Sequence, residues 1–100
     1  MARKEDRYSY LQEVELEFAS GKRSARISDI SSGGCYIDTI AQIPVGEPLN
    51  LRILAINGES MQFRGTVAYI LEGVGFGVEF TDITVDHRKF ILRLLSSSER

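Results

Sequence analysis

Apolar residues recur at every second position through much of the first eighty residues. In the segment VELEF, Val14, Leu16 and Phe18 alternate with glutamates. Alternation of period two places the apolar residues on one face of a half-buried strand. Five further segments have the length and composition of strands, namely residues 23–30, 35–39, 49–56, 61–70 and 73–80. We therefore predict six short strands.

Turn residues separate these segments. Ser20–Lys22 and the double-proline stretch IPVGEP are typical of loops, and Asn57-Gly58 predicts a two-residue hairpin in which both residues adopt positive φ. Six closely spaced strands without an intervening helix indicate antiparallel pairing, and closure into a barrel removes exposed sheet edges. In the last strand we expect four side chains to point inward, those of Val74, Phe76, Val78 and Phe80.

The apolar period changes after residue 83. Phe90, Ile91, Leu94 and Leu95 form a single stripe on a helix. Thr84 is a suitable N-cap, and the carboxylate of Asp86 in the first turn complements the helix dipole. We predict an amphipathic C-terminal helix that closes one end of an all-β, six-stranded antiparallel barrel.

Length and composition indicate one soluble domain. The chain has 100 residues, 43% apolar and 26% charged, with a formal net charge of −2. We interpret residues 1–10 as an N-terminal arm and 11–100 as the barrel with its helix. No apolar run approaches the ~20 residues that span a bilayer, and the charged N-terminus has no apolar signal core. A lone cysteine, Cys35, fits a small core residue in a reducing compartment. We expect a cytoplasmic protein without membrane insertion.

Residues for catalysis or metal binding are scarce. The chain has one histidine, His87, which we interpret as a surface residue, and no P-loop or nucleophile elbow. Gly73, Gly75 and Gly77 are spaced two apart and precede a strand, so they do not fit a dinucleotide-binding loop. We interpret them as relieving crowding in a bent strand. We therefore expect no enzyme activity, no metal and no cofactor.

Two short motifs remain. Arg3 and Arg7 are four residues apart and lie on the same side of an extended or helical arm, where two guanidinium groups suit a phosphate. In DISSGG, Asp29 and Ser31 project the same way if the chain is extended, and glycines such as Gly34 permit close approach of a ligand. A carboxylate beside arginines fits a ligand that carries both phosphate and guanine, because the Watson–Crick edge of guanine is rich in donors.

The spacing of RKEDR and DISSGG resembles the RxxxR and DxSxxG motif pair of PilZ domains, bacterial receptors for the second messenger cyclic di-GMP. The resemblance extends over the whole chain through the strand GCYIDT, the segment GVGFGVEF and the final amphipathic helix. It implies a six-stranded barrel with a C-terminal helix. It also implies that Arg3 and Arg7 hold phosphate and guanine, that Asp29 and Ser31 hydrogen-bond a guanine or adjacent backbone, and that Gly34 permits close approach.

On this reading, ligand binding orders the arm and alters the surface presented to a protein partner. Two alternatives stay open. Glu5 and Asp6, between the arginines, favour a barrel that has lost its ligand and acts as a protein-interaction module, although such solvent-exposed ion pairs are worth only ~0–1 kcal/mol. Tyr8 and Tyr10 beside the arginines allow single-stranded nucleic-acid binding by stacking. The acidic balance and the glutamates of EVELE argue against this last reading, so we expect no DNA or RNA partner.

Overall fold

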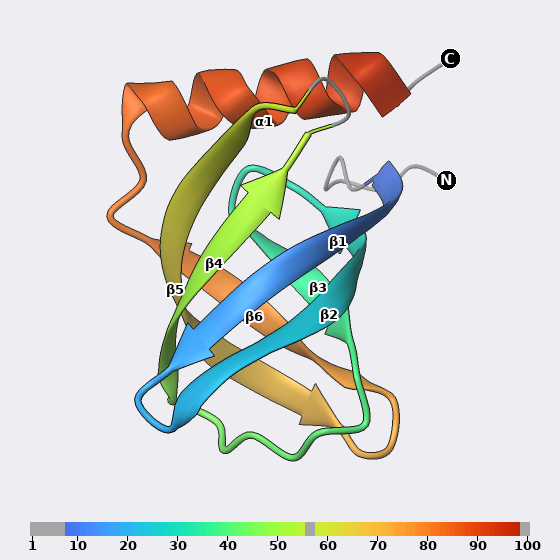
Figure 1. The fold of residues 1–100 in the computed structure, drawn as a ribbon, viewed down its shortest axis with the longest axis vertical. Helices are drawn as coiled ribbons and strands as arrows, with labels where there is room; N and C mark the ends of the chain where they lie inside the picture. The colour runs from blue at the N-terminus through green and yellow to red at the C-terminus, as the bar shows by residue number, and fades with distance from the viewer. Residues whose placement is uncertain (1–7, 56–57, 99–100) are drawn as a thin grey trace.

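The protein is a closed six-stranded antiparallel barrel with a C-terminal helix (Figure 1). The computed structural model describes residues 8–55 and 58–98. The strands are β1 (Tyr8–Phe18), β2 (Gly21–Ile30), β3 (Gly34–Asp38), β4 (Pro48–Leu54), β5 (Ser60–Leu71) and β6 (Gly75–Thr81). They follow one another around the barrel in the order β1-β2-β3-β6-β5-β4, and β4 pairs with β1 to close it. The predicted fold class is confirmed.

The alternating apolar residues fill the interior of the barrel. Val14, Leu16 and Phe18 of β1 are buried, and every other described strand contributes buried apolar side chains. Cys35 is a buried free cysteine in this core, which confirms its prediction as a small core residue. The prediction for Val74 was wrong: its side chain is 55% exposed. Val74 lies in the turn before β6, which begins one residue later at Gly75, so the strand alternation does not yet apply to it.

Strand β6 approaches its neighbours closely because of its glycines. A Cβ on Gly75 would collide with the carbonyl oxygen of Ile37 on β3, and the ring of Tyr69 on β5 occupies the space above Gly77. Gly73 has φ of +75° and forms the preceding turn, where Val74 N–H donates to Leu71 O at 2.9 Å. The interpretation of these glycines as a response to crowding therefore holds for Gly75 and Gly77, whereas Gly73 serves the turn.

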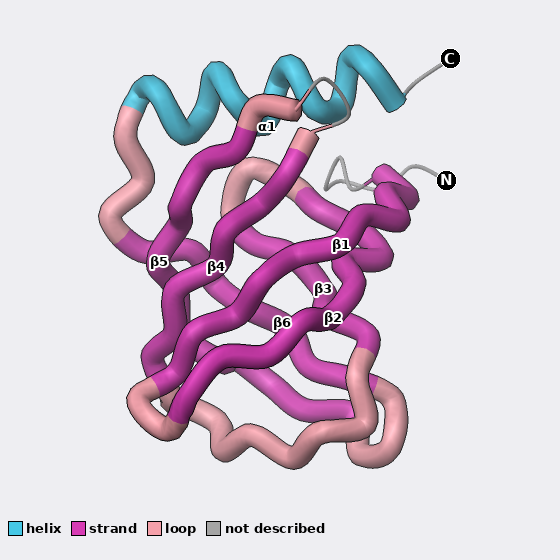
Figure 2. The backbone as a smooth tube through the Cα atoms, viewed as in Figure 1, coloured by secondary structure: helices cyan, strands magenta, loops and turns pink. Residues whose placement is uncertain are grey.

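Helix α1 (Val85–Ser98) lies across one end of the barrel, which we call the helix end (Figure 1). Its buried side chains are Phe90, Ile91 and Leu94, and the Phe90 ring packs against Phe63 with centroids 5.9 Å apart. The opposite end, the loop end, is formed by three loops of residues 19–20, 39–47 and 72–74 (Figure 2). In the described ranges, 8–55 and 58–98, no helix combines the length and apolar character needed to cross a bilayer.

Thr84 caps α1, as predicted, and His87 completes the cap. The backbone N–H of His87 donates to Thr84 Oγ1 at 3.2 Å, while Thr84 N–H donates to Nδ1 of His87 at 3.1 Å. These two bonds form a reciprocal capping box in which histidine takes the place usually held by glutamate. The Nε2 atom of His87 also lies 2.9 Å from the carbonyl oxygen of Gln62, which joins the start of α1 to β5. His87 is thus a half-buried structural residue.

The β4–β5 hairpin forms where the sequence predicts it, with a different turn. Gly58 N–H donates to Ala55 O at 3.0 Å, and Ala55 N–H donates to Glu59 O at 2.7 Å. Gly58 has φ of +93°, so the positive φ predicted for it is confirmed. It was predicted to be a central residue of a two-residue loop. Asn57 lies outside the described residues.

Candidate ligand-binding site

The DISSGG segment forms the tight β2–β3 turn at the helix end of the barrel (Figure 1). Ser31 N–H donates to Gly34 O at 2.8 Å, and Gly33 N–H donates to Ser31 Oγ at 3.3 Å. The carbonyl of Gly33 accepts a 2.9 Å hydrogen bond from Phe80 N–H on β6. The turn is therefore closed by its own polar groups and attached to a neighbouring strand.

Ser31 and Gly34 have structural roles within this turn. Strand β2 ends at Ile30, so the extended geometry that would project Asp29 and Ser31 the same way does not continue to Ser31. Its hydroxyl lies 3.4 Å from Gly34 O and accepts from Gly33 N–H. A Cβ on Gly34 would collide with the carbonyl oxygen of Val78, so glycine is needed there for the approach of β3 to β6. Its predicted role toward a ligand stays a prediction.

Asp29 lies beside irregularities in both neighbouring strand pairs. Its backbone pairs with Ser9 on β1 and Tyr36 on β3, and the register shifts between Ser9 and Gln12 in one pair and between Ile27 and Asp29 in the other. Ile27 and Ile30 are both fully buried although they are three residues apart, which a regular strand of period two does not allow. A bulge of this kind re-aims side chains and is common beside functional sites. Asp29 itself is half-buried.

The barrel brings the chain segment after the arginine motif next to the DISSGG turn. Tyr8, the first described residue, pairs with Ile30 at the end of β2. Arg7 directly precedes Tyr8 in the sequence, whereas Arg3 and Arg7 themselves lie outside the described residues. Residues 8–10, predicted to be part of the arm, belong to β1. Two motifs separated by 22 residues in the sequence are therefore connected to adjacent strands at the helix end.

Tyr36 is the most enclosed polar side chain beside Asp29. The residue is 9% exposed, and its hydroxyl is buried without a hydrogen-bond partner among the described residues. Burial raises the pKa of Tyr36, and the nearby Asp38, Tyr69 and Asp29 raise it further. The phenol therefore stays protonated well beyond neutral pH and remains a potential donor.

Comparison with known proteins identifies the family. The family model described as the PilZ domain matches residues 2–97. The chain belongs to the PilZ domain family. No curated protein matches it.

Solved structures share the fold of this PilZ domain at low sequence identity. YcgR from Escherichia coli in complex with c-di-GMP has a TM-score of 0.82 and 18% identity, covering 100% of this chain and 47% of that one. The PilZ domain of YcgR from E. coli with c-di-GMP has a TM-score of 0.78 and 15% identity over 100% and 93%. The PilZ domain of CeSA from a cellulose-synthesizing bacterium has a TM-score of 0.71 and 20% identity over 94% and 98%. The chain spans about half of the longer YcgR structure.

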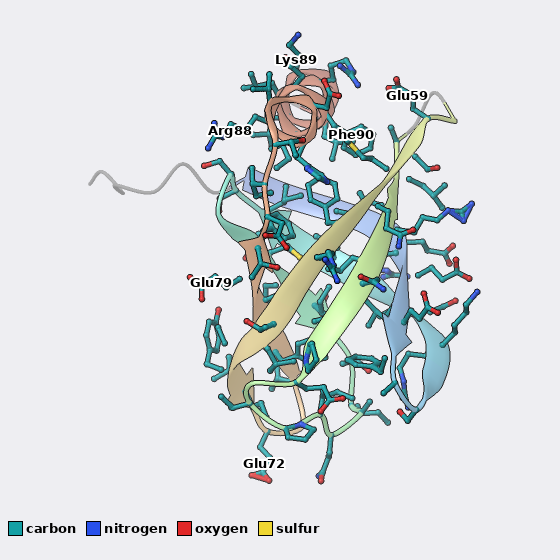
Figure 3. All side chains as sticks on the ribbon, turned by 90° about the vertical axis from the view of Figure 1, so that its left-hand side faces the viewer. Glu59, Glu72, Glu79, Arg88, Lys89 and Phe90 are labelled. Carbon is teal, nitrogen blue, oxygen red and sulfur yellow. The ribbon has the colours of Figure 1, made fainter. Side chains whose placement is uncertain are left out.

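The structure adds residues around the turn that sequence reasoning did not name. Figure 3 shows Arg88 on α1 and Glu79 on β6 on the same side of this PilZ domain as the β2–β3 turn. Glu79 pairs with Gly34, which fixes its place beside the turn. Within the described part of the chain neither side chain has an ion-pair partner. Tyr36 was missed because its surroundings come from another strand: it pairs with Gly77, and its hydroxyl lies close to Gly75. The bulge at Asp29 could have been predicted from the sequence, because the apolar residues Ile27 and Ile30 are three positions apart and not two.

Proposed function

We propose that this PilZ domain is a receptor for cyclic di-GMP, which binds at the β2–β3 turn beside the start of β1. The observation that carries the proposal is the pairing of Tyr8 with Ile30, because it connects the RxxxR segment to the strand adjacent to DISSGG. The structures of YcgR described as complexes with c-di-GMP share this fold, which supports the same ligand class. Family membership supports a receptor in preference to an enzyme.

The proposed residue roles follow from their chemistry. Arg3 and Arg7 bind phosphate and guanine acceptors through bidentate guanidinium contacts. Asp29 accepts from the donor-rich edge of guanine, which a carboxylate matches. Ser31 and Gly34 contribute mainly by holding the turn, since Ser31 Oγ accepts from Gly33 N–H and Gly34 lets β3 approach β6.

The proposed switch is an ordering of the N-terminal arm over the ligand. Fixing about five residues costs roughly 5–10 kcal/mol of backbone entropy. Charge-assisted hydrogen bonds return about 1.5–3 kcal/mol each, so two arginines with two bonds apiece offset that cost. The remaining margin is small, and loss of either arginine is therefore expected to abolish tight binding. The ordered arm then presents a different surface to a protein partner, which relays the signal.

Isothermal titration of cyclic di-GMP into the wild-type chain tests the proposal. We expect micromolar or tighter binding that is lost in Arg7→Ala and in Asp29→Ala. The matched control is Arg23→Ala, since Arg23 is an exposed arginine on β2 that pairs with Leu16 near the loop end. Far-UV circular dichroism of each variant separates loss of the site from loss of the fold.

The alternative of a protein-interaction module without a ligand predicts a different result. A folded wild-type chain that gives no heat at high cyclic di-GMP concentration would contradict the receptor proposal. Thermal denaturation provides a second measurement, because a ligand at 100 times its Kd adds about 2.7 kcal/mol to the free energy of unfolding. Equal stability with and without ligand would contradict the proposal independently of calorimetry.

A further inference from the structure

A row of cross-strand partners leads away from Asp29 over the outer face of the barrel. Asp29 on β2 pairs with Tyr36 on β3, and Tyr36 pairs with Gly77 on β6. Gly77 in turn pairs with Tyr69 on β5. Neighbouring strands are 4.7–4.9 Å apart, so Gly77 lies about 10 Å from Asp29 along this row. The row therefore joins the candidate site to a second group of side chains.

Two tyrosine rings lie flat on this row because β6 carries no side chains beneath them. The ring and hydroxyl of Tyr69 occupy the space above Gly77, with the hydroxyl 2.8 Å from the position a Cβ would take. The hydroxyl of Tyr36 lies 2.9 Å from the corresponding position above Gly75. The two ring centroids are 6.3 Å apart and the ring planes differ by 25°. The two rings are therefore stacked beside each other.

The two rings differ in their access to solvent. Tyr36 is 9% exposed and Tyr69 is 44% exposed, so Tyr36 supports a neighbour whose ring faces the outside. The buried hydroxyl of Tyr36 has no hydrogen-bond partner among the described residues. Because an unpaired buried hydroxyl is destabilising, stability alone would favour phenylalanine over tyrosine at this position. An exposed aromatic ring held flat by packing is the surface on which nucleobases stack, because every base has a π-face.

We propose that Tyr69, supported by Tyr36, is a stacking platform for one purine ring of the ligand that binds at Asp29. The inference rests on the proposed function, since a cyclic dinucleotide carries two bases. One base meets the carboxylate of Asp29 through its edge, and the second extends along the row and stacks on Tyr69. Tyr69 is then a ligand-contacting residue outside both sequence motifs, and Tyr36 is a positioning residue.

If the role of Tyr69 is purely structural, the expected result differs from that of stacking. An aromatic ring on a neighbouring strand covers a strand glycine and shields its backbone from water. If this is the whole role of Tyr69, its replacement lowers the melting temperature and leaves the ligand affinity of the folded protein unchanged. If Tyr69 stacks on a base, the ligand affinity is instead retained when the replacement residue is aromatic and reduced when it is not.

Two substitutions distinguish the effect of the aromatic ring of Tyr69 from the effect of its apolar bulk. Tyr69→Phe keeps an aromatic ring over Gly77, and Tyr69→Leu keeps an apolar side chain without one. We expect calorimetric titration with cyclic di-GMP to give an affinity near that of wild type for Tyr69→Phe and one weakened roughly tenfold or more for Tyr69→Leu. The control Val74→Ala, at an exposed apolar residue of the β5–β6 turn, is expected to bind as wild type does. Ring protons of Tyr69 are expected to shift upfield in NMR spectra at saturating ligand.

The outcomes distinguish this inference from the function on which it rests. Wild-type binding with an unchanged affinity in Tyr69→Leu overturns the platform and leaves the receptor function intact. Absence of wild-type binding overturns the receptor function, and the platform with it. Wild-type binding that is weakened in Tyr69→Leu and retained in Tyr69→Phe supports both.

Discussion

The two ends of the barrel are closed in different ways. At the helix end, α1 places Phe90, Ile91 and Leu94 against the interior, and all three are buried. At the loop end, Ile40 is 84% exposed and Val74 is 55% exposed. The two loops that carry them are joined by a hydrogen bond of 3.1 Å from Thr39 N–H to Val74 O. Figure 2 shows the helix and the β2–β3 turn at one end and the loops of residues 19–20, 39–47 and 72–74 at the other. The helix end is closed by a helix whose side chains enter the core, whereas at the loop end only Ile43 of the 39–47 loop is buried and Ile40 and Val74 stay exposed.

This difference bears on where a site can be held. The helix end contains the β2–β3 turn, whose neighbour Phe80 packs its ring 4.8 Å from that of Phe63. Phe63 also contacts the rings of His87 and Phe90. The turn is thus supported by the same aromatic cluster that anchors α1. A site in this position inherits the rigidity of the core, which is what a preorganised binding site requires.

The largest effect is expected from removing the packing of the helix. Phe90→Ala is predicted to lower the free energy of unfolding by about 3–5 kcal/mol, because a buried aromatic ring is lost and leaves a cavity. Leu92→Ala is the control on the same helix, since Leu92 is 63% exposed, and a change within about 0.5 kcal/mol is expected there. Urea denaturation followed by circular dichroism measures both. Equal losses in the two variants would contradict the packing of α1 described above.

Two adjacent glycines sharpen the comparison within the turn itself. Gly34→Ala is predicted to cost about 1–3 kcal/mol, because its Cβ would displace the backbone of β6 at Val78. Gly33→Ala adds a Cβ that meets nothing within 4 Å and requires no positive φ, so it is expected to be nearly neutral. Chemical denaturation compares the pair. A tolerated Gly34→Ala would mean that β3 and β6 are not held together as closely as the structure has them.

The cap of α1 is expected to contribute less. His87→Ala removes the acceptor for Thr84 N–H and the contact to Gln62 O, and loss of a cap typically costs about 1 kcal/mol. Lys89→Ala, at an exposed position of the same helix, is the control. The melting temperature is the measurement. If His87→Ala melts as wild type does, the hydrogen bonds that join α1 to β5 contribute nothing measurable to stability.

The smallest effect is expected at the loop end. Ile40→Ser is predicted to change the free energy of unfolding by less than about 0.5 kcal/mol, because Ile40 is 84% exposed and loses little apolar burial. A loss above about 1 kcal/mol in urea denaturation would show that the loop end packs more tightly than described, and would remove the contrast between the two ends.

Much of the fold could be predicted because local patterns carried it. The alternation of Val14, Leu16 and Phe18 identified a strand facing the core, and the stripe through Phe90 and Leu94 identified the helix. Thr84 was identified as the N-cap because capping depends on residues only a few positions apart. Such signals act within one element, so the sequence by itself determined the order of the elements, their buried faces and the family resemblance.

Other features depend on which strands become neighbours, and only the tertiary structure decided them. Gly34 must be glycine because of Val78, and His87 joins the barrel through Gln62, contacts between residues far apart in the sequence. The row from Asp29 to Tyr69 exists only because β3 lies between β2 and β6, and β6 between β3 and β5. Local patterning specifies which face of a strand is buried, whereas barrel closure and register specify what each outer residue meets.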